Sequence, residues 1–413
     1  MSQGRVFAYC HDSVGIGHLT RTLAICDRVG RQYPFASFLV ATGTPYVPLF
    51  ANLERVDYIK LPALAKGEHD QDGSVNAQCY RGKFLPIAID HLIDYRKAVL
   101  RETVEHFEPD IVLVDKAPLG VCGELLPALR WLRRHRPEVR IVFGMRDIED
   151  APEATIAQWE DAGIPDALEE CFDEVWVYGS RSVFDVIQEY RLSRAVQAKL
   201  SFLGYVTRGP CDHGPCPSNT DPAILVTVGG GTDGEFLLRT YLDDAGPRLR
   251  DLGYSSVIIG GPDLPASAAK SLRSAAERIP NAEWLDFVPC LNCRIRTAEL
   301  VVSMGGYNTL CQLVGNRKRA LVVPRTKPRR EQSIRANLWA QRGLVYTVDP
   351  DDLQPATLTD RIRDVLENGS MNGIDELDLG GLDRICDRFG RFFGCPIASA
   401  VGAETPSAAS VCL

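Results

Sequence analysis

The sequence predicts an α/β protein made of two Rossmann-like domains that face a cleft. Apolar runs typical of buried strands alternate with helical patterns along the chain. The first strand of each half is followed by glycines and then by a helix, at residues 15–17 in the first half and at residues 229–231 in the second. Two domains of this kind leave a cleft between them, which is a common place for substrates.

The first half, residues 1–206, is expected to hold seven strands. Apolar runs predict them at residues 5–10, 38–41, 58–61, 110–115, 140–143, 174–179 and 203–206. Helices are expected at residues 19–32, 87–107 and 123–135 and within the acidic stretch 150–171. The polar residues 65–83 predict a long exposed loop, and loops of this length inside an α/β domain are often functional.

The second half, residues 223–376, follows a segment at 207–222 that is rich in Pro, Gly and Cys and is expected to be an interdomain linker. Strands are predicted at residues 223–228, 256–260, 282–287, 300–302, 320–323 and 344–348, and helices at 235–243, 310–314 and 358–367. Another helix is expected within residues 377–396, and the small and polar residues 397–413 are expected to be disordered.

The stretch from residue 303 to residue 332 carries the clearest functional signal. A buried strand ends at Gly305-Gly306, and Asn308 or Thr309 is expected to open the next helix. The first N–H groups of a helix are free and its dipole is positive there, so this arrangement favours an anion that the glycines allow to approach closely. Seven basic residues lie between positions 317 and 330, which predicts half of a pocket for a phosphate and a sugar. A solvated basic loop after an ordinary turn is the alternative.

These residues resemble the donor-nucleotide motif of the GT-B glycosyltransferases. The similarity is greatest to the bacterial lipid-linked N-acetylglucosamine transferases of peptidoglycan synthesis (MurG-like) and to related uncharacterised bacterial glycosyltransferases. The resemblance implies that Gly305, Gly306, Asn308 and Thr309 contact the diphosphate of a nucleotide sugar, that Gln312 meets the ribose, and that Glu331 and Gln332, on the next loop, bind sugar hydroxyls, with Arg325 nearby. The family usually has Glu at the position of Gln312, so the identity of the nucleotide stays open.

The resemblance extends to other parts of the chain. It implies a second diphosphate loop at Gly230, Gly231 and Thr232 and a base-binding segment around Val288. It also implies that the helix within residues 377–396 crosses back onto the first domain. The donor is therefore expected on the second domain and the acceptor on the first.

His18 follows Gly15 and Gly17 at the start of the first predicted helix, on the expected acceptor side. The carboxyl edge of a parallel sheet is where ligands bind in such folds, and an imidazole titrates in the range that a general base needs. Asp115 or Asp147, each close to the end of a predicted strand, could orient it. The alternative is a capping or surface histidine.

Composition narrows the class of protein. The chain of 413 residues has 45% hydrophobic and 24% charged residues, which is ordinary for a globular protein. Its net charge of −8 argues against general nucleic-acid binding. No run approaches the roughly 18 apolar residues of a membrane span, and the N-terminus lacks the pattern of a signal peptide. Together with an odd count of 13 cysteines, this predicts a cytoplasmic protein with reduced thiols.

Two minor motifs each have a functional and a purely structural interpretation. Cys211, His213 and Cys216, with Cys290 and Cys293, could form a zinc site, but independent thiols suit their spacing better. The arginines at 130, 133, 134 and 136 could contact acidic lipid head groups at the inner membrane face, although a solvated helix face is the simpler interpretation.

The function predicted from these features is glycosyl transfer from a nucleotide diphosphate sugar, expected to be a UDP-sugar, to a hydroxyl acceptor. The resemblance implies inversion at the anomeric carbon. Neither a metal nor another cofactor is expected to be required, since no metal-binding pattern stands at a strand end. A non-hydrolysing UDP-sugar 2-epimerase and a non-catalytic nucleotide-sugar-binding protein are the alternatives.

Overall fold

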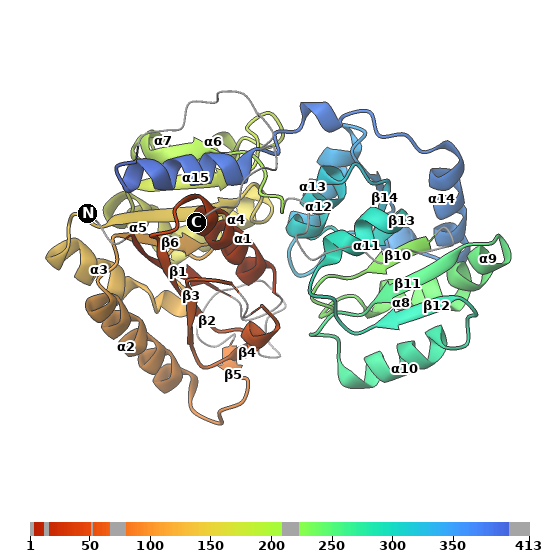
Figure 1. The fold of residues 1–413 in the computed structure, drawn as a ribbon, viewed down its shortest axis with the longest axis horizontal. Coiled ribbons are helices and arrows are strands. Elements are labelled where there is room, and N and C mark those ends of the chain that lie inside the picture. Colours follow the sequence, from red (N-terminus) through yellow and green to blue (C-terminus); the bar gives the residue numbers. More distant parts are fainter. Residues whose placement is uncertain (1–3, 12–15, 51–52, 67–79, 209–222, 396–413) are drawn as a thin grey trace, which may run out of the picture.

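The computed structural model describes residues 4–11, 16–50, 53–66, 80–208 and 223–395. Two parallel sheets lie side by side, each with helices packed around it (Figure 1). The seven-stranded sheet comes from the first half of the chain and the six-stranded sheet from the second. Within the described ranges, no helix is both long and apolar enough to cross a membrane.

The first sheet has the strand order β3-β2-β1-β6-β7-β8-β9. These strands are β1 (Arg5–Cys10), β2 (Ser37–Thr42), β3 (Val56–Lys60), β6 (Ile111–Asp115), β7 (Arg140–Arg146), β8 (Glu174–Tyr178) and β9 (Leu200–Phe202). The helices around it are α1 (Gly17–Gln32), α2 (Ile89–Phe107), α3 (Leu126–His135), α4 (Pro152–Asp161), α5 (Ile164–Cys171), α6 (Val186–Glu189) and α7 (Arg194–Lys199). A separate antiparallel pair is formed by β4 (Leu64–Lys66) and β5 (Tyr80–Gly82). The residues between these strands, 67–79, make up most of the predicted exposed loop and lie outside the described part.

The second sheet has the order β12-β11-β10-β13-β14-β15. Its strands are β10 (Ala223–Thr227), β11 (Ser255–Ile259), β12 (Ala282–Leu285), β13 (Ala298–Ser303), β14 (Ala320–Val322) and β15 (Tyr346–Thr347). The helices are α8 (Glu235–Thr240), which continues through a π turn into α9 (Gly246–Asp251), then α10 (Ala266–Ala276), α11 (Leu291–Thr297), α12 (Tyr307–Gly315), α13 (Glu331–Ala340) and α14 (Pro355–Asn368).

The order of strands reverses at one place in each sheet, between β1 and β6 in the first and between β10 and β13 in the second. All the strands of both sheets pair in parallel, so their carboxyl ends share one edge. Ligands of open α/β sheets bind in the crevice outside those ends, at the point where the order reverses. The residues after these four strands are therefore the ones that the fold places at a binding site.

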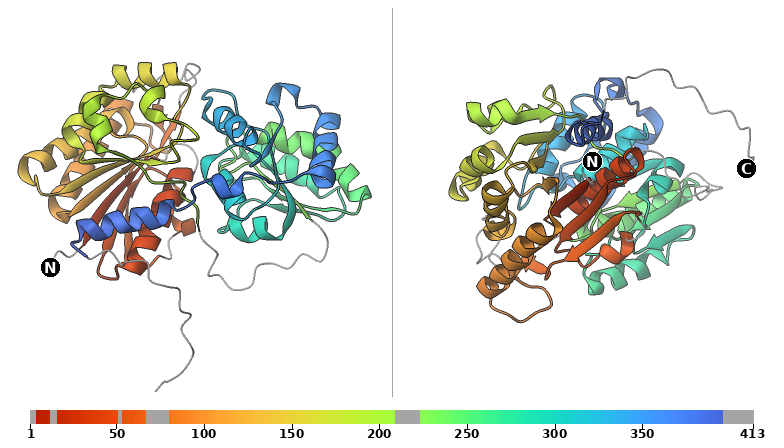
Figure 2. Two further views of the ribbon diagram at one scale, coloured as in Figure 1. Left: turned by 90° about the horizontal axis from the view of Figure 1, so that it is seen from above. Right: turned by 60° about the vertical axis from the view of Figure 1, so that its left-hand side comes forward.

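The last helix, α15 (Gly381–Phe392), packs on the first domain beside α1, although it follows the second domain in the chain (Figures 1 and 2). Its buried Phe389 and its Phe392 have ring centroids 5.8 and 6.2 Å from that of Trp176 in β8. Arg384 Nη1 donates to the carbonyl of Leu203 at 2.7 Å. This return of the chain ties the two domains together.

The two domains also share a hydrophobic core. Tyr205, Tyr307 and Trp339 are buried there together, and the ring centroids of Tyr205 and Trp339 are 5.1 Å apart. The hydroxyl of Tyr307 donates to the carbonyl of Tyr178 at 2.9 Å and accepts from the amide of Val206 at 3.0 Å. The start of α12 is thus anchored on the first domain.

Several predicted elements differ from the structure. The prediction of a last strand at residues 203–206 is wrong, because β9 ends at Phe202. After it, Leu203 and Gly204 each donate one backbone hydrogen bond, to Val177 and Gly179, and Tyr205 pairs with the segment that leads into α15. The helices α10 and α13 were not predicted from the sequence. Of the predicted linker, Thr207 and Arg208 belong to the described part, whereas the predicted disordered tail lies outside it.

Candidate active site

A cavity of about 760 Å³ lies between the two domains. The first domain contributes a basic and histidine-containing wall: His11, Gly17, His18, Thr20, Arg21, Lys83, Lys116 and Arg146. The second domain contributes the glycine turns and the residues around α12 and α13: 229–233, 287–289, 306–309, Gln312, Arg325, Arg329, Glu331 and Gln332. Thirteen of the residues proposed from the sequence, including His18 and Gly17, line this one cavity.

The start of α12 has the form that an anion site requires. Gly306 is its N-cap and no side chain accepts a hydrogen bond from the first turn. The prediction that Asn308 or Thr309 opens the helix is therefore wrong, because Asn308 lies inside the first turn. Its Nδ2 instead donates to the carbonyl of Gly17 at 2.7 Å and to Thr20 Oγ1 at 2.8 Å. The backbone N–H groups of the first turn of α12 have no side-chain cap, while the side chain of Asn308 joins α12 to α1.

A second glycine turn follows β10. Gly231 has a φ of 97°, and a Cβ there would lie 2.5 Å from the carbonyl oxygen of Gly260, so only glycine fits. The amide of Asp263 donates to the carbonyl of Gly230 at 2.7 Å. Gly230, Gly231 and Thr232 all line the cavity, on the same side as the start of α12.

Four other predicted positions have different outcomes. Val288 and Gln312 line the cavity. Gly305 does not line the cavity. It lies against Gln332, because a Cβ at position 305 would be 3.1 Å from the Cβ and from the carbonyl oxygen of Gln332. Gly305 therefore allows close packing behind the wall. Gly15 lies outside the described residues.

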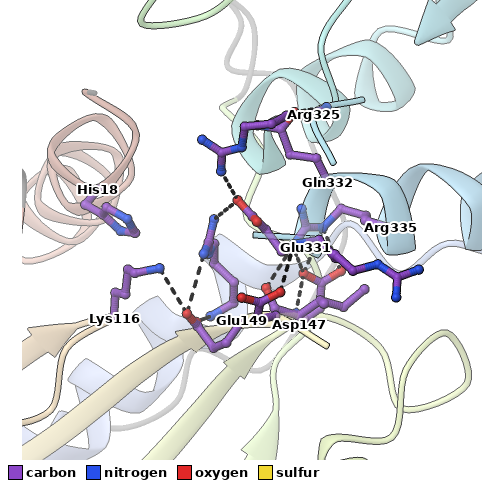
Figure 3. Close-up of polar contacts among 12 residues, drawn as sticks. His18, Lys116, Asp147, Glu149, Arg325, Glu331, Gln332 and Arg335 are labelled. Carbon is purple, nitrogen blue, oxygen red and sulfur yellow. Dashed lines mark hydrogen bonds and ion pairs between the residues drawn. The ribbon is translucent and has the colours of Figure 1, made fainter. Parts of the chain in front are cut away.

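Arg325 links several residues on the second-domain wall of the cavity (Figure 3). Its Nη1 donates to Asp233 Oδ2 at 2.6 Å and its Nη2 to Glu331 Oε1 at 2.7 Å, and its amide donates to Gln332 Oε1 at 3.1 Å. Burial would raise the pKa of Glu331, but the charge of Arg325 and other nearby cations outweighs it and lowers that pKa. The resemblance implied that Glu331 and Gln332 lie in a loop, but they are the first two residues of α13.

His18 and Asp115 form a polar pair on the first domain, with His18 partly buried and Asp115 buried. His18 Nδ1 lies 2.7 Å from Asp115 Oδ2. Arg21, one turn further along α1, donates to Asp115 Oδ1 from Nε at 3.0 Å and from Nη2 at 2.8 Å. The guanidinium favours an ionised Asp115 carboxylate, which in turn favours a proton on His18 Nδ1. Arg21 Nη2 also lies 2.9 Å from His18 Nδ1 and can only donate, so this second contact favours a lone pair on the same nitrogen. When Nδ1 of a neutral His18 carries the proton, Nε2 carries the lone pair.

The protonation of His18 suits that arrangement. The pKa of His18 lies well below its ordinary value, mainly because the side chain is buried and further because of the charges of Arg21, Lys116 and Arg146. Burial raises the pKa of Asp115, an effect that the charge of Arg21 opposes. His18 is therefore neutral at neutral pH, as a general base must be before it accepts a proton.

Asp147, the other candidate partner of His18, has a different role. Its Oδ1 accepts from Nη2 of Arg335 at 2.7 Å, and both side chains are fully buried. Arg335 lies in α13 of the second domain, so this ion pair fastens the two domains. Of the two predicted partners, Asp115 is the one that lies within hydrogen-bond distance of His18.

Lys116 and Glu149 lie next to His18 (Figure 3), and Arg146 joins them in a charged cluster. Lys116 Nζ lies 3.1 Å from Glu149 Oε2, and Arg146 Nη2 lies 3.4 Å from the same oxygen. Burial lowers the pKa of Lys116 to about 7. Burial alone would raise the pKa of Glu149, but Lys116 and Arg146 lower it to about 2. Arg146 Nη1 also lies 3.9 Å from Glu331 Oε1, so the cluster reaches across the cavity to the second domain.

The predicted basic segment is only partly in the cavity. Arg325 and Arg329 line it. Arg317 pairs with Asp375, Arg319 pairs with Glu299, and Lys318 donates to the carbonyl of Ala298 at 2.7 Å. These three cations therefore make contacts within the second domain and do not line the cavity.

The arginines considered for membrane contact do not act as one group. Arg133 donates to the carbonyl of Cys171 at 2.8 Å and to Asp173 Oδ2 at 2.8 Å, so it is engaged within the fold. Arg130 and Arg134 are exposed. Contact of this helix with a membrane stays a prediction.

The zinc hypothesis falls mostly outside the described residues, which exclude Cys211, His213 and Cys216. In the part of the chain that the structure describes, no three His, Cys, Asp or Glu side chains are arranged to hold a metal ion. The prediction that no cofactor is required stays a prediction.

Four residues near His18 were not predicted as site residues: Arg21, Lys116, Arg146 and Glu149. The sequence nevertheless holds signals for three of them. Lys116 directly follows β6, and Arg146 ends β7, so both stand at the carboxyl edge of the sheet. Arg21 lies three residues after His18, which places both on one face of a helix. Glu149 had no comparable signal, because its position depends on the turn after β7.

Comparison with known proteins gives a consistent picture. Residues 224–373 match the model of the glycosyltransferase family 28 C-terminal domain. A curated relative from Syntrophotalea carbinolica, a UDP-N-acetylglucosamine–N-acetylmuramyl-(pentapeptide) pyrophosphoryl-undecaprenol N-acetylglucosamine transferase, is 28% identical over 159 residues. That match spans 37% of this chain and 43% of the relative, less than half of its length.

Solved structures resemble the whole chain. The kitacinnamycin glycosyltransferase has a TM-score of 0.63 at 16% identity, and the match covers 95% of this chain and 100% of that one. A Listeria monocytogenes structure attributed to a UDP-N-acetylglucosamine 2-epimerase has a TM-score of 0.62 at 10% identity, with 95% and 97% coverage. At these identities the likeness concerns the fold, which transferases and epimerases share.

Proposed function

We propose that this chain, which has the GT-B fold and carries a glycosyltransferase family 28 C-terminal domain at residues 224–373, transfers a sugar from a nucleotide diphosphate sugar to a hydroxyl acceptor. The observation that carries the proposal is the meeting of two helix N-termini in one cavity. Asn308, in the first turn of α12, donates to the carbonyl of Gly17 at 2.7 Å, directly before His18. An anion site and a neutral imidazole thus face the same space.

The donor is proposed to lie on the second domain. The diphosphate would contact the N–H groups at the start of α12 and the turn at residues 229–232. Helix N-termini and arginines stabilise the charge that develops on a departing diphosphate. Arg325 and Arg329 both line the cavity there and supply that positive charge. Residues 287–289 would contact the base, and Glu331 and Gln332 the sugar hydroxyls.

The acceptor is proposed to approach from the first domain. His18 Nε2 would take the proton from the acceptor hydroxyl while the hydroxyl oxygen attacks the anomeric carbon. The bond from that carbon to the diphosphate oxygen breaks, and its electron pair leaves with the diphosphate. Attack from the side opposite the leaving group inverts the anomeric centre. Asp115 acts as a positioning residue, since it holds the Nδ1 proton of His18 and stabilises the imidazolium that forms.

The nucleotide is proposed to be UDP, and Gln312 is the residue that tests this choice. Its side chain lines the cavity one helical turn after Asn308. If it meets the ribose, Gln312→Glu should change the dissociation constants of UDP, GDP and dTDP unequally, because a carboxylate accepts two hydroxyl hydrogen bonds and adds a charge. Calorimetric titration of the three nucleotides measures this. Identical constants for both proteins across the panel would mean that Gln312 faces elsewhere.

Incubation with a panel of UDP-, GDP- and dTDP-sugars tests the function itself. A thermal-shift screen first selects the donors, since a bound ligand raises apparent stability. Product analysis by chromatography then separates the alternatives. Release of nucleoside diphosphate with sugar transferred or hydrolysed supports a transferase. Accumulation of the 2-epimer would indicate an epimerase, and binding without any product would indicate a binding protein.

The location is proposed to be cytoplasmic, with peripheral contact at the inner membrane face as a further hypothesis. Its support is the odd number of cysteines, 13, scattered through the predicted strands and helices. Cell fractionation of the tagged chain, with and without Arg130→Ala and Arg134→Ala, tests both statements.

A further inference from the structure

Two cysteines stand next to the donor side of the cavity with a spacing that allows them to react with each other. Cys290 is the N-cap of α11 and Cys293 lies in its first turn. Their Sγ atoms are 3.8 Å apart, and both residues are partly exposed. A bonded pair of sulfurs is about 2.05 Å apart, so the two thiols are separate but need to approach by less than roughly 2 Å to form a disulfide.

The segment that holds these cysteines is a wall of the cavity. Residues 287–289 precede Cys290 and Leu291 follows it, and all four line the cavity. Asn292, between the two cysteines, donates from Nδ2 to the carbonyl of Arg208 at 3.3 Å, and its Oδ1 accepts from Nδ2 of Asn316 at 3.0 Å. Asn316 ends α12, the helix whose start forms the anion site. A covalent bond between the two sulfurs would therefore move a surface that the donor contacts.

Other described cysteines are less suited to this chemistry. Cys10, Cys26, Cys171 and Cys311 are buried within the sheets and helices. Burial raises the pKa of the Cys26 and Cys311 thiols, and raises that of Cys386 to about 11, which leaves little thiolate at neutral pH. Cys122 and Cys395 are partly exposed and serve as comparisons.

We propose that Cys290 and Cys293 form a reversible disulfide that weakens donor binding, a regulatory modification of the donor site that rests on the proposed function. A small-molecule disulfide such as oxidised glutathione is the oxidant. The thiolate of one cysteine attacks a sulfur of the glutathione disulfide, forms a mixed disulfide and releases one glutathione thiolate. The second cysteine then attacks the protein sulfur of that mixed disulfide and releases the second glutathione. The two protons of the cysteines end on the two glutathione thiols.

The bond itself is tested by mass spectrometry on the full-length chain. The protein is reduced, freed of reductant, equilibrated with oxidised and reduced glutathione, and alkylated before digestion. The expected result is that the peptide containing both cysteines is two hydrogen atoms lighter than its reduced form and carries a disulfide between Cys290 and Cys293. Cys290→Ser and Cys293→Ser should each abolish the linked peptide, whereas Cys122→Ser should retain it. A link from either residue to another cysteine, a lasting mixed disulfide with glutathione, or stoichiometric zinc bound through these thiols would overturn the proposal.

The effect on the donor is tested by calorimetric titration of UDP, GDP and dTDP into the reduced and the oxidised protein. We expect the dissociation constant of the preferred nucleotide to rise roughly three- to tenfold on oxidation and to return on addition of dithiothreitol. Cys293→Ser should keep the reduced value under both conditions. Equal constants for the two forms of the wild type would overturn the link to donor binding.

These measurements keep the two proposals apart. If the reduced protein binds none of the nucleotides, the proposed function fails, while the peptide map still decides whether the disulfide forms. If the reduced protein binds a nucleotide and no linked peptide appears, the disulfide fails and the donor site stands.

Discussion

The imidazole of His18 is held by the carboxylate of Asp115, with Nδ1 and Oδ2 2.7 Å apart. His18 follows β1 and Asp115 ends β6, which are the two strands between which the order of the first sheet reverses. The two residues are 97 positions apart in the sequence. The topology of the sheet, and no local motif, brings them together.

His18→Ala should lower turnover by roughly 10²–10⁴, the usual range for loss of a general base. Donor affinity should stay nearly the same, because the proposed donor contacts lie on the second domain. The measurement is kcat at a saturating acceptor concentration, with the Kd of the donor determined separately. His106→Ala, which removes an imidazole from an exposed position on α2, is the matched control. Near-normal turnover of His18→Ala would make His18 a contact for the acceptor or phosphate.

Gly306→Val should abolish nucleotide binding without unfolding the protein. Gly306 has φ −63° and ψ 135°, which valine adopts readily, and a Cβ there would meet nothing closer than Thr309 Oγ1 at 3.9 Å. The isopropyl group would instead occupy the space proposed for the phosphate. Titration calorimetry and circular dichroism check the two halves of this prediction.

The neighbouring glycine provides the contrast for that experiment. Gly305→Ala places a Cβ 3.1 Å from that of Gln332, so it should lower the free energy of unfolding by about 1–3 kcal/mol, the usual cost of overpacking. Unchanged binding heat with Gly306→Val would exclude this turn from the donor site, whatever the outcome for Gly305.

Arg335→Met should reduce the free energy of unfolding by about 3–5 kcal/mol, because it leaves the buried carboxylate of Asp147 without its partner. The double variant Arg335→Met, Asp147→Leu should recover much of that loss, since no buried charge remains. Urea denaturation measures both. Arg239→Met, which breaks an exposed pair with Glu235, should change the free energy by no more than about 1 kcal/mol. Equal losses for the buried and the exposed pair would contradict the assignment.

Glu149 should make stability depend on pH in the acid range. Its pKa in the folded state is about 2, below the ordinary value of 4.5, so between these values the unfolded chain binds a proton that the folded protein does not. Its contribution is fully present above pH 4.5 and is lost as pH falls toward 2. The stability advantage of wild type over Glu149→Gln, on the order of 3 kcal/mol, should therefore shrink as pH falls through that range. A difference that stays constant in urea titrations from pH 6 to pH 3 would argue against this electrostatic origin.

The structure confirms most of the predicted strands and the glycine turns, and these predictions were correct because both features depend on local sequence. A buried parallel strand is a short continuous apolar run, and a turn that approaches an anion needs glycine, so both leave direct marks in the sequence. The motif around Gly306 and the position of His18 were identified for that reason. The expected cap at Asn308 was wrong because its carboxamide has a better partner on another domain, the carbonyl of Gly17.

The sequence by itself determined the class of fold, the repeated unit of strand, glycine turn and helix, and the identity of the residues at the strand ends. The tertiary structure decided which of those residues meet. Asp115 and Asp147 stand at the ends of neighbouring strands, and the sequence did not distinguish them. In the structure Asp115 contacts His18, whereas Asp147 pairs with Arg335 of the second domain. The physical reason is that hydrophobic patterning and backbone conformation act over a few residues, whereas an ion pair in a cleft depends on the packing of two whole domains.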